Sequence, residues 1–266
     1  MIPLRDNIPS RTTPLVNWIV IGICGLVFLQ QVQEDPNLPG MVERYGMIPA
    51  RIQSPDSPVE IPVAMEQQRT PRGIEFRTIT REAVPPAVPP VLTMLTCVFL
   101  HGSWLHILGN MWFLYIFGDN VEDRFGHLGY ALFYLTCGVA ASVVHYISDP
   151  SSPVPTIGAS GAIAGVMGAY FIWYPKAHVQ TLVPIFVFIQ ILVLPAPLFL
   201  GIWFLIQFVN GAMMGAGTAS GVAWWAHIGG FAAGVAFALL MGRAHLLRPR
   251  NDQRLRGTEQ LGLYQR

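Results

Sequence analysis

Long apolar stretches alternate with more polar ones along this 266-residue chain. Six of the apolar stretches resemble membrane helices in length and composition. A helix needs about 20 mostly apolar residues to cross the hydrocarbon core of a bilayer. The pattern therefore predicts an all-α membrane protein, with six transmembrane helices and a long loop between the first and the second. The predicted helices lie near 14–33, 93–118, 127–147, 158–175, 195–215 and 221–242.

The first apolar stretch, Leu15 to Leu29, with its polar flank Gln30 to Gln33, has an alternative interpretation as a signal peptide. No small-x-small cleavage motif precedes Glu34-Asp35, so we expect a helix that is retained.

The segment 179–194 is also ambiguous, because it is apolar but short, β-branched and bracketed by prolines. Taken as a seventh span, it would place the two termini on opposite sides of the membrane. With six spans, the two termini lie on one side of the membrane and the short loops 148–157 and 216–220 lie on the other. These two loops contain no Lys or Arg, so the positive-inside rule favours both termini in the cytoplasm. We therefore expect 179–194 to be interfacial or re-entrant. The basic residues on the cytoplasmic side are Arg5, Arg11, Arg124, Lys176, Arg243, Arg248, Arg250, Arg254, Arg256 and Arg266.

Composition agrees with the membrane class. Charged residues make up 12% of the chain, against about 25% in soluble domains. The net charge of +1 and the lack of a basic stripe argue against a nucleic-acid partner. Three dispersed cysteines, Cys24, Cys97 and Cys137, suit packing better than disulfides or zinc.

The loop between the first two helices is rich in proline and mixed in charge. We expect an extracytoplasmic insertion over 53–90, with short strands near 59–65 and 74–80. The predicted organisation is a cytoplasmic N-terminus (1–13), a first transmembrane helix (14–33), an extracytoplasmic loop (34–92), a core of helices 2–6 (93–242) and a basic cytoplasmic tail (243–266).

Four polar residues share one depth in this topology. The second, fourth and sixth helices all run inward from outside, and His106, Asn110, Ser160 and His227 fall within roughly their first two turns. A Ser and a His that meet there would form a nucleophile and its general base. Ser160, Ala164 and Gly168 share one helix face, with Gly161 and Gly165 beside it; His227, Gly230 and Gly234 share another. Such small residues let membrane helices approach closely.

Each of these residues also has an ordinary interpretation. Ser160 could bond its own helix, and the glycines could form an ordinary packing seam. His101, His106 and Asn110 could be interhelical hydrogen-bonding groups, or the two histidines metal ligands. Their spacing of five, with no HExxH motif or carboxylate, argues against a metal. Asn110, four residues after His106, instead suits a pair of donors aimed at an oxyanion. The remaining histidines, His127, His145, His178 and His245, are expected at interfaces.

The motifs closely resemble those of the rhomboid family of intramembrane serine proteases, in its bacterial six-helix form. The matching segments extend over most of 93–242 and are HGSWLHILGNMWFLYIFG (101–118), Gly118-x3-Glu122-x3-Gly126, GASGAIAG (158–165) and AHIGGFAAG (226–234). The N-terminal Ile2 to Asp6 and Tyr45 to Pro49 are also similar to bacterial members.

The resemblance implies an intramembrane serine endopeptidase in the bacterial inner membrane, acting on transmembrane protein substrates without metal or organic cofactor. It implies a dyad of Ser160 and His227, and an oxyanion hole formed by His106, Asn110 and the Ser160 N–H. Glu122 and Arg124 would belong to a structural cluster below the site, and His101 would help to fold the 35–92 loop. A lateral gate would form between Trp203 and Phe204 of the fifth helix and Phe113 or Trp112 of the second.

The chain departs from the family pattern where many members carry a Tyr stacked on the catalytic His, because Ala164 stands there. Trp224, Trp225 or tighter backbone packing would then orient the base. Two rival functions remain: a rhomboid-like pseudoprotease that binds membrane clients without cleavage, and a transporter or channel. The first would usually lack the Ser or the His, and the second predicts inverted repeats, which are not visible.

Overall fold

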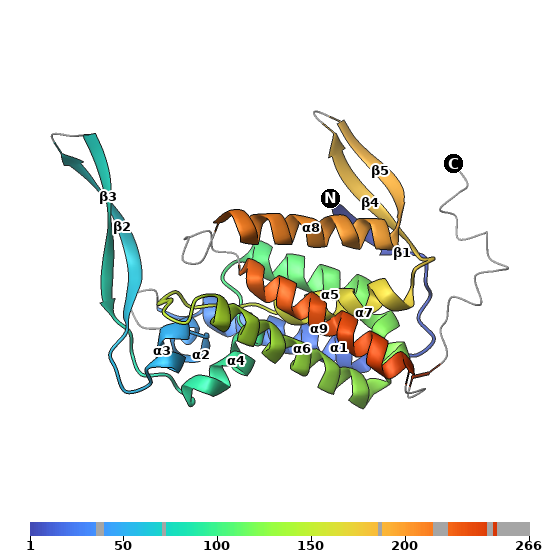
Figure 1. Ribbon diagram of the computed structural model, residues 1–266, viewed down its shortest axis with the longest axis horizontal. Helices are drawn as coiled ribbons and strands as arrows, with labels where there is room; N and C mark the ends of the chain where they lie inside the picture. Colours follow the sequence, from blue (N-terminus) through green and yellow to red (C-terminus); the bar gives the residue numbers. More distant parts are fainter. Residues whose placement is uncertain (36–39, 71–72, 186–187, 215–222, 244–246, 249–266) are drawn as a thin grey trace.

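Helices form the body of the molecule, and two small β-sheets lie at its opposite ends (Figure 1). The computed structural model describes residues 1–35, 40–70, 73–185, 188–214, 223–243 and 247–248. The predicted loop 216–220 and most of the basic tail lie outside these residues. The long helices are α1 (Leu15–Val32), α5 (Trp104–Phe125), α6 (His127–Ser148), α7 (Ser160–Trp173), α8 (Ala196–Met214) and α9 (Trp224–Arg243).

The described residues are mostly helical and contain four or five candidate membrane spans, which confirms the predicted fold class. Four helices, α1, α6, α8 and α9, are long and apolar enough to cross a bilayer. A fifth candidate is the bent pair Pro90–Phe99 and Trp104–Phe125. Helix α7 has only 14 residues, which is less than the about 20 that a span requires. The count of six spans therefore stays a prediction.

The second predicted helix is broken, so the single helix expected over 93–118 was wrong. Short helical turns come first, and after a bend of 79° α5 runs on to Phe125. Ser103 explains the new start, because its extended backbone and side chain cap α5 by accepting a hydrogen bond from the His106 N–H at 3.2 Å. Gly126 ends the helix with a φ of +71°. The turns are η1 (Pro90–Leu92), α4 (Thr93–Thr96) and η2 (Cys97–Phe99).

The ambiguous segment 179–194, expected to be interfacial or re-entrant, forms a β-hairpin, and its interfacial position stays a prediction. Its strands β4 (His178–Ile185) and β5 (Phe188–Pro195) pair antiparallel, and β4 also pairs with the N-terminal strand β1 (Ile2–Asp6). The β-branched residues of the segment favour strands. Proline at its ends also disfavours continuation into α8 as one helix.

The long loop contains the two expected strands, which are longer than predicted: β2 (Glu60–Thr70) and β3 (Gly73–Glu82). They form a hairpin that projects from the end of the bundle opposite β1 (Figure 1). At the base of this hairpin, Arg81 donates two hydrogen bonds to the Glu43 carboxylate of the short helix α2 (Met41–Tyr45), at 2.9 and 2.7 Å. Another short helix, α3 (Pro49–Gln53), follows α2.

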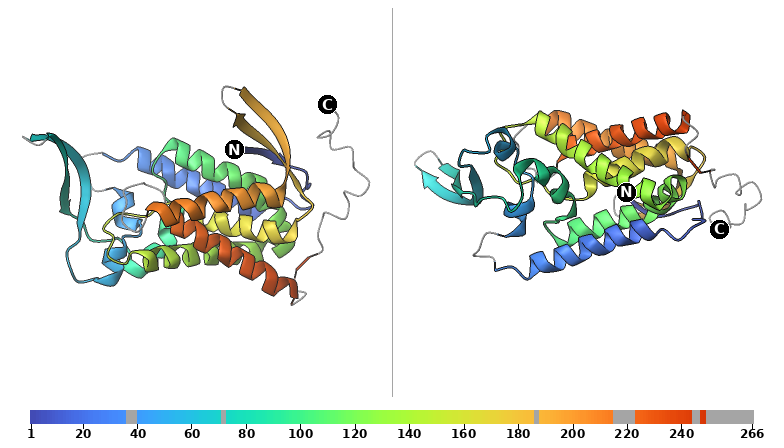
Figure 2. Two further views of the ribbon diagram at one scale, coloured as in Figure 1. Left: turned by 45° about the horizontal axis from the view of Figure 1, so that its top comes forward. Right: turned by 90° about the horizontal axis from the view of Figure 1, so that it is seen from below.

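Helix α7 is the centre of the bundle and packs against α5, α6 and α9 (Figure 2). Its residues from Gly161 to Tyr170 are all buried. Glycines allow α9 to lie against it: a Cβ added to Gly230 would lie 2.0 Å from the Gly161 carbonyl oxygen, and one added to Gly234 would lie 1.9 Å from that of Gly165. Backbone therefore packs on backbone along this seam.

A second polar cluster lies where α5 ends, beside the start of α1. The Glu122 carboxylate accepts hydrogen bonds from the Val16 and Asn17 N–H groups at 3.0 and 2.8 Å, which caps α1. Asp123 accepts from the Arg11 and Thr12 N–H groups just before that helix. These two acidic residues fix the first helix against the bundle.

Candidate active site

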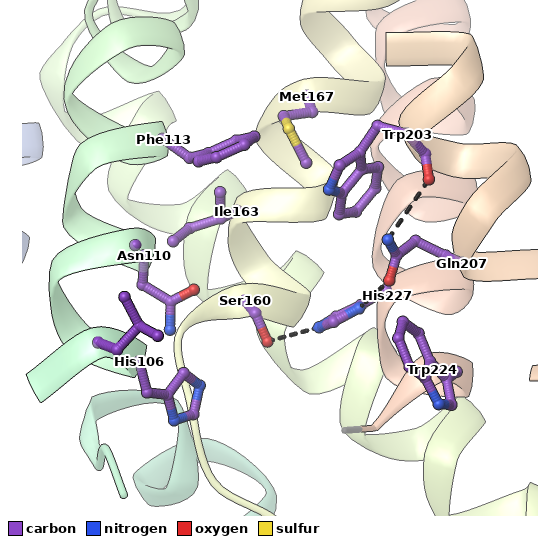
Figure 3. A pocket seen from close by; sticks show the side chains of 12 residues that line it. His106, Asn110, Phe113, Ser160, Ile163, Met167, Trp203, Gln207, Trp224 and His227 are labelled. Atoms are coloured by element: carbon purple, nitrogen blue, oxygen red, sulfur yellow. Dashed lines mark hydrogen bonds between the residues drawn. The ribbon is translucent and has the colours of Figure 1, made fainter. Parts of the chain in front are cut away.

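The four polar residues singled out from the sequence line one pocket. Helices α5, α7 and α9 begin at the same end of the bundle, and these residues lie within the first seven positions of each. The pocket has a volume of about 290 Å³ and opens among α5, α7, α8 and α9 (Figure 3). Its lining comprises Leu105, His106, Gly109, Asn110, Phe113, Ser160, Ile163, Met167, Trp203, Gln207, Trp224 and His227.

Ser160 and His227 are in direct hydrogen-bonding contact. The Ser160 Oγ lies 2.8 Å from the His227 Nε2, within the range that proton transfer from a nucleophile to its base requires. The close α7–α9 seam makes this contact possible, because both side chains are short and start from helices that touch through glycine. The pair therefore has the geometry of an activated serine.

The opposite nitrogen of the same imidazole contacts Gln207 of α8, a residue that the sequence interpretation missed. The Gln207 Oε1 lies 2.7 Å from the His227 Nδ1 (Figure 3). Gln207 is a polar residue in an otherwise largely apolar run, and an amide within a membrane helix usually has a bonding partner or a function. This amide in an apolar run was the sequence signal that could have identified Gln207.

His106 is held in the tautomer of a hydrogen-bond donor. Its Nδ1 accepts a hydrogen bond from the Gly102 N–H at 3.4 Å, so the proton of the neutral ring lies on Nε2. That Nε2 lies beside Gly158, where an added Cβ would approach it to 2.7 Å. Gly158 also has a φ of +124°, so glycine is required there both by the backbone and by the ring.

Asn110 provides a second donor. Its Nδ2 atom is buried and has no hydrogen-bond partner among the described residues. A buried amide without a partner is costly, so a group that a ligand would satisfy is expected here. The backbone N–H of Ser160 is a third donor, because first-turn amides have no acceptor within their own helix. Together these donors suit a developing negative charge.

Two indole rings lie close to His227. The Trp203 ring lies 5.8 Å from the imidazole at a tilt of 39°, and the Trp224 ring lies 6.2 Å from it, edge-on. Trp225 instead lies near Gly211 of α8. The imidazole of His227 is thus held by contacts with Gln207 and two tryptophans.

The chain is similar to known proteins. The family model described as Rhomboid domain matches residues 89–244, which is more than half of the chain. The chain belongs to the rhomboid family.

Three relatives are similar to parts of this rhomboid. Rhomboid-like protein 11, chloroplastic, of Arabidopsis thaliana is 41% identical over 78 residues, covering 29% of this chain and 28% of that protein. RHOMBOID-like protein 4 of the same plant is 33% identical over 162 residues, or 59% and 34% of the two chains. Putative rhomboid protease YdcA of Bacillus subtilis (strain 168) is 31% identical over 77 residues, or 29% and 38%. The chain thus spans less than half the length of each of them.

The residues expected at a lateral gate do not all lie between α5 and α8 in this rhomboid. Phe113 faces α8, where its ring lies 6.4 Å from that of Phe199, one turn before Trp203. Trp112 does not, because its Nε1 donates a hydrogen bond to the Pro3 carbonyl at 2.6 Å. Phe204 packs on Phe231 of α9 at 4.6 Å. Phe199 of α8 therefore contacts two rings of α5, that of Phe113 and, at 6.2 Å, that of Phe117.

The three residues expected to be structural lie outside the Ser–His pair. His101 is buried at the bend before α5; its backbone pairs with the Gln31 side chain of α1, and its ring packs edge-on against His106 at 5.1 Å. These contacts are with α1 and α5, and a role of His101 in folding the 35–92 loop stays a prediction. Glu122 and Arg124 lie at the far end of α5, where Arg124 stacks over Trp173 at 5.3 Å.

The described residues contain no group of three or more His, Cys, Asp or Glu side chains placed to hold a metal ion. Among the histidines expected at interfaces, His127 contacts Glu122 with its Nδ1 at 2.5 Å. The backbone N–H of His178 bonds the Asn7 side chain at 2.8 Å, and His245 lies outside the described residues.

Proposed function

We propose that this rhomboid is an intramembrane serine endopeptidase that hydrolyses peptide bonds in or near transmembrane segments of membrane proteins. The observation that carries the proposal is the 2.8 Å contact between Ser160 and His227 inside a pocket with unpartnered donors. Two relatives are named proteases, Putative rhomboid protease YdcA and Rhomboid protease GluP, the second 37% identical over 76 residues. In this proposal 93–242 is the catalytic core.

The reaction would begin with proton transfer. His227 Nε2 takes the Ser160 proton as Oγ attacks the scissile carbonyl, and the oxyanion that forms is held by His106 Nε2, Asn110 Nδ2 and the Ser160 N–H. The imidazolium then gives its proton to the leaving amine. Water, activated by the same histidine, hydrolyses the acyl-enzyme. No proposed step needs a metal or an organic cofactor.

The short length of α7 supports access of water to this site. At about 1.5 Å per residue, its 14 residues extend about 21 Å, while the hydrocarbon core is about 30 Å thick. A central helix that starts below the membrane surface leaves a recess above Ser160. We propose that hydrolytic water enters there from the extracytoplasmic side.

The substrate would enter laterally between α5 and α8, past Phe113 and Phe199. A transmembrane helix must unwind locally before its carbonyl is accessible, because its backbone groups are otherwise paired internally. Segments with helix-breaking residues and a small side chain at the cleaved bond are therefore the expected substrates.

The proposed orientation places both termini in the cytoplasm and, in a bacterium, the protein in the inner membrane. The start of α1 and the end of α9 lie at the same end of the bundle, as an even number of spans requires (Figure 1). Arg124 lies there in the last turn of α5, and Arg11 lies beside it through its N–H bond to Asp123, in agreement with the positive-inside rule.

Co-expression with a reporter that carries a cleavable transmembrane segment tests the function. Wild type should cleave the reporter, and Ser160→Ala and His227→Ala should not, at equal membrane levels. Equal cleavage by all three chains would contradict the dyad. Retained binding of the reporter without cleavage by wild type would favour a client-binding pseudoprotease instead.

A further inference from the structure

Gln207 is a buried amide on α8, a helix whose other side exposes large apolar side chains. Its exposed fraction is 6%, whereas its neighbours Ile206 and Phe208 are 47% and 48% exposed. Burial of an amide in an apolar environment costs free energy unless the amide is hydrogen-bonded. Gln207 meets this condition with two partners, Trp203 of its own helix and His227 of α9.

These two partners fix which end of the amide faces the histidine. The Gln207 Nε2 lies 3.4 Å from the Trp203 carbonyl oxygen, which can only accept a hydrogen bond. The amide nitrogen therefore faces Trp203, and the Oε1 faces the His227 Nδ1 at 2.7 Å. An oxygen acceptor at that position requires the ring proton on Nδ1. Nε2 is then left unprotonated toward Ser160, as a general base requires.

Helix α8 lies at the edge of the bundle and packs mainly against α9 (Figure 1). Phe204 makes a main contact between them, with its ring 4.6 Å from that of Phe231. The hydrogen bond that selects the tautomer of His227 thus comes from a peripheral helix, whereas Ser160 is on the central one.

We propose that Gln207 is a positioning residue for His227, and that it orients the base only while α8 is packed against α9. The inference rests on the proposed protease function and adds regulation of its activity. A displaced α8 would leave His227 without the hydrogen bond that fixes its tautomer. Gln207 would act through His227 and form no bond to the substrate.

Replacement of the acceptor tests this role. Gln207→Met keeps the length and flexibility of the side chain but removes the amide, and Ile206→Leu on the lipid-facing side of α8 is the matched control. In proteoliposomes with a cleavable transmembrane substrate, we expect kcat of the Met variant to fall about 5- to 50-fold, the effect of one hydrogen bond. KM should change little, and the control should match wild type.

Gln207→Glu separates positioning from packing. A carboxylate at this position still accepts the Nδ1 proton and stabilises the imidazolium, so activity should be retained and the acid limb of the pH–rate profile should move to higher pH. Among the described residues, the other titratable groups near His227 are His106 of α5 and His145 of α6, which both variants leave unchanged. A residue that only packs would not move this limb.

The dependence on α8 is tested by a double-mutant cycle. Phe204→Ala should loosen α8 and lower kcat in wild type, but it should add little to the loss in Gln207→Met, because the same hydrogen bond is already absent. Additive losses would contradict the coupling to α8.

A structural readout keeps this inference separate from the proposed function. Nitrogen-15 NMR of histidine-labelled protein distinguishes the two imidazole tautomers, and the signal of His227 is assigned by its loss in His227→Gln. Wild type should carry the proton on Nδ1, and Gln207→Met should show a mixture of tautomers. An unchanged tautomer and unchanged kcat in Gln207→Met would overturn the inference while leaving a wild-type protease intact. If wild type itself does not cleave, the proposed function fails independently of the tautomer result.

Discussion

At the scale of residues, the proposed chemistry depends on donors that have no partner before the substrate arrives. Asn110 Nδ2 is buried without a hydrogen-bond partner among the described residues, and the tautomer of His106 directs its Nε2 proton beside Gly158. Donors fixed in advance in this way need no reorganisation when an oxyanion forms, so they favour the transition state over the ground state.

Asn110→Ala should therefore lower kcat by about 100- to 1,000-fold, the usual effect of the loss of one oxyanion donor. KM should change much less, because the bond forms mainly in the transition state. Kinetics in proteoliposomes measure both constants. A rise in KM at constant kcat would instead assign Asn110 to ground-state binding.

The residue scale also shows what the sequence could predict. His106, Asn110, Ser160 and His227 were placed at one depth by helix direction alone, and the structure brings all four to one pocket. Gln207 was missed because its signal, a single amide in an apolar helix, has no distinctive spacing. Its contact with His227 depends on how α8 is rotated about its axis, and apolar periodicity does not determine that for a helix that is hydrophobic on most sides.

At the scale of elements, the α7–α9 seam brings nucleophile and base together. Gly230→Ala would place a Cβ 2.0 Å from the Gly161 carbonyl oxygen, so the helices must separate. We expect a loss of about 1–3 kcal/mol in the free energy of unfolding, together with loss of cleavage.

Gly242→Ala, on the same helix, is the control for this change. An added Cβ there meets nothing within 4 Å. Removal of a helical glycine should therefore be neutral or stabilise the protein by up to about 1 kcal/mol. Reversible unfolding in mixed micelles measures both variants. Equal stability of the two would show that the seam is not tightly packed.

The N-terminal strand is fixed by Asp6, which accepts hydrogen bonds from Tyr170 of α7 at 2.6 Å and from Asn120 of α5 at 3.0 Å. Burial raises the pKa of Asp6 to about 7, although the Tyr170 bond opposes this rise. The folded protein then binds more protons than the unfolded chain between about pH 4 and pH 7, so the contribution of Asp6 to stability falls as the pH rises through that window.

Asp6→Asn should remove this contribution to the pH dependence. The thermal midpoint in detergent should decrease between pH 5 and pH 8 by more in wild type than in the Asn variant, which isolates Asp6 from the histidines that titrate in both. Parallel decreases in the two proteins would contradict a raised pKa of Asp6.

Two features of the elements were not predicted from the sequence, and each has a physical reason. The bend before α5 depends on one capping residue, Ser103, within a stretch whose composition favours a continuous helix. The hairpin at 178–195 was not predicted because an apolar run of that length fits a strand pair and a membrane segment equally well. Its pairing with Ile2–Asp6 is a contact over more than 170 residues that no local pattern contains.

At the scale of the whole molecule, the projecting β2–β3 hairpin lies apart from the proposed chemistry. None of its described residues lines the pocket, and the first two pairs at its base are Glu60 with Glu82 and Ile61 with Arg81. Replacement of 62–80 by an Asn-Gly turn keeps both of these pairs and suits a tight hairpin. The thermal midpoint should stay close to that of wild type, and reactivity of Ser160 should change by no more than about twofold. Loss of the folded state would show that the hairpin supports the bundle.

The central claim, that Ser160 is a nucleophile activated by His227, is tested most directly with a serine-reactive fluorophosphonate. In this reaction Ser160 Oγ attacks phosphorus and fluoride leaves, so intact mass spectrometry and peptide mapping report the adduct without knowledge of the substrate. We expect a single adduct on Ser160 in purified wild type, none in Ser160→Ala, and a much slower reaction in His227→Ala. A wild-type protein that folds but does not react at Ser160, or an equal rate in His227→Ala, would contradict it.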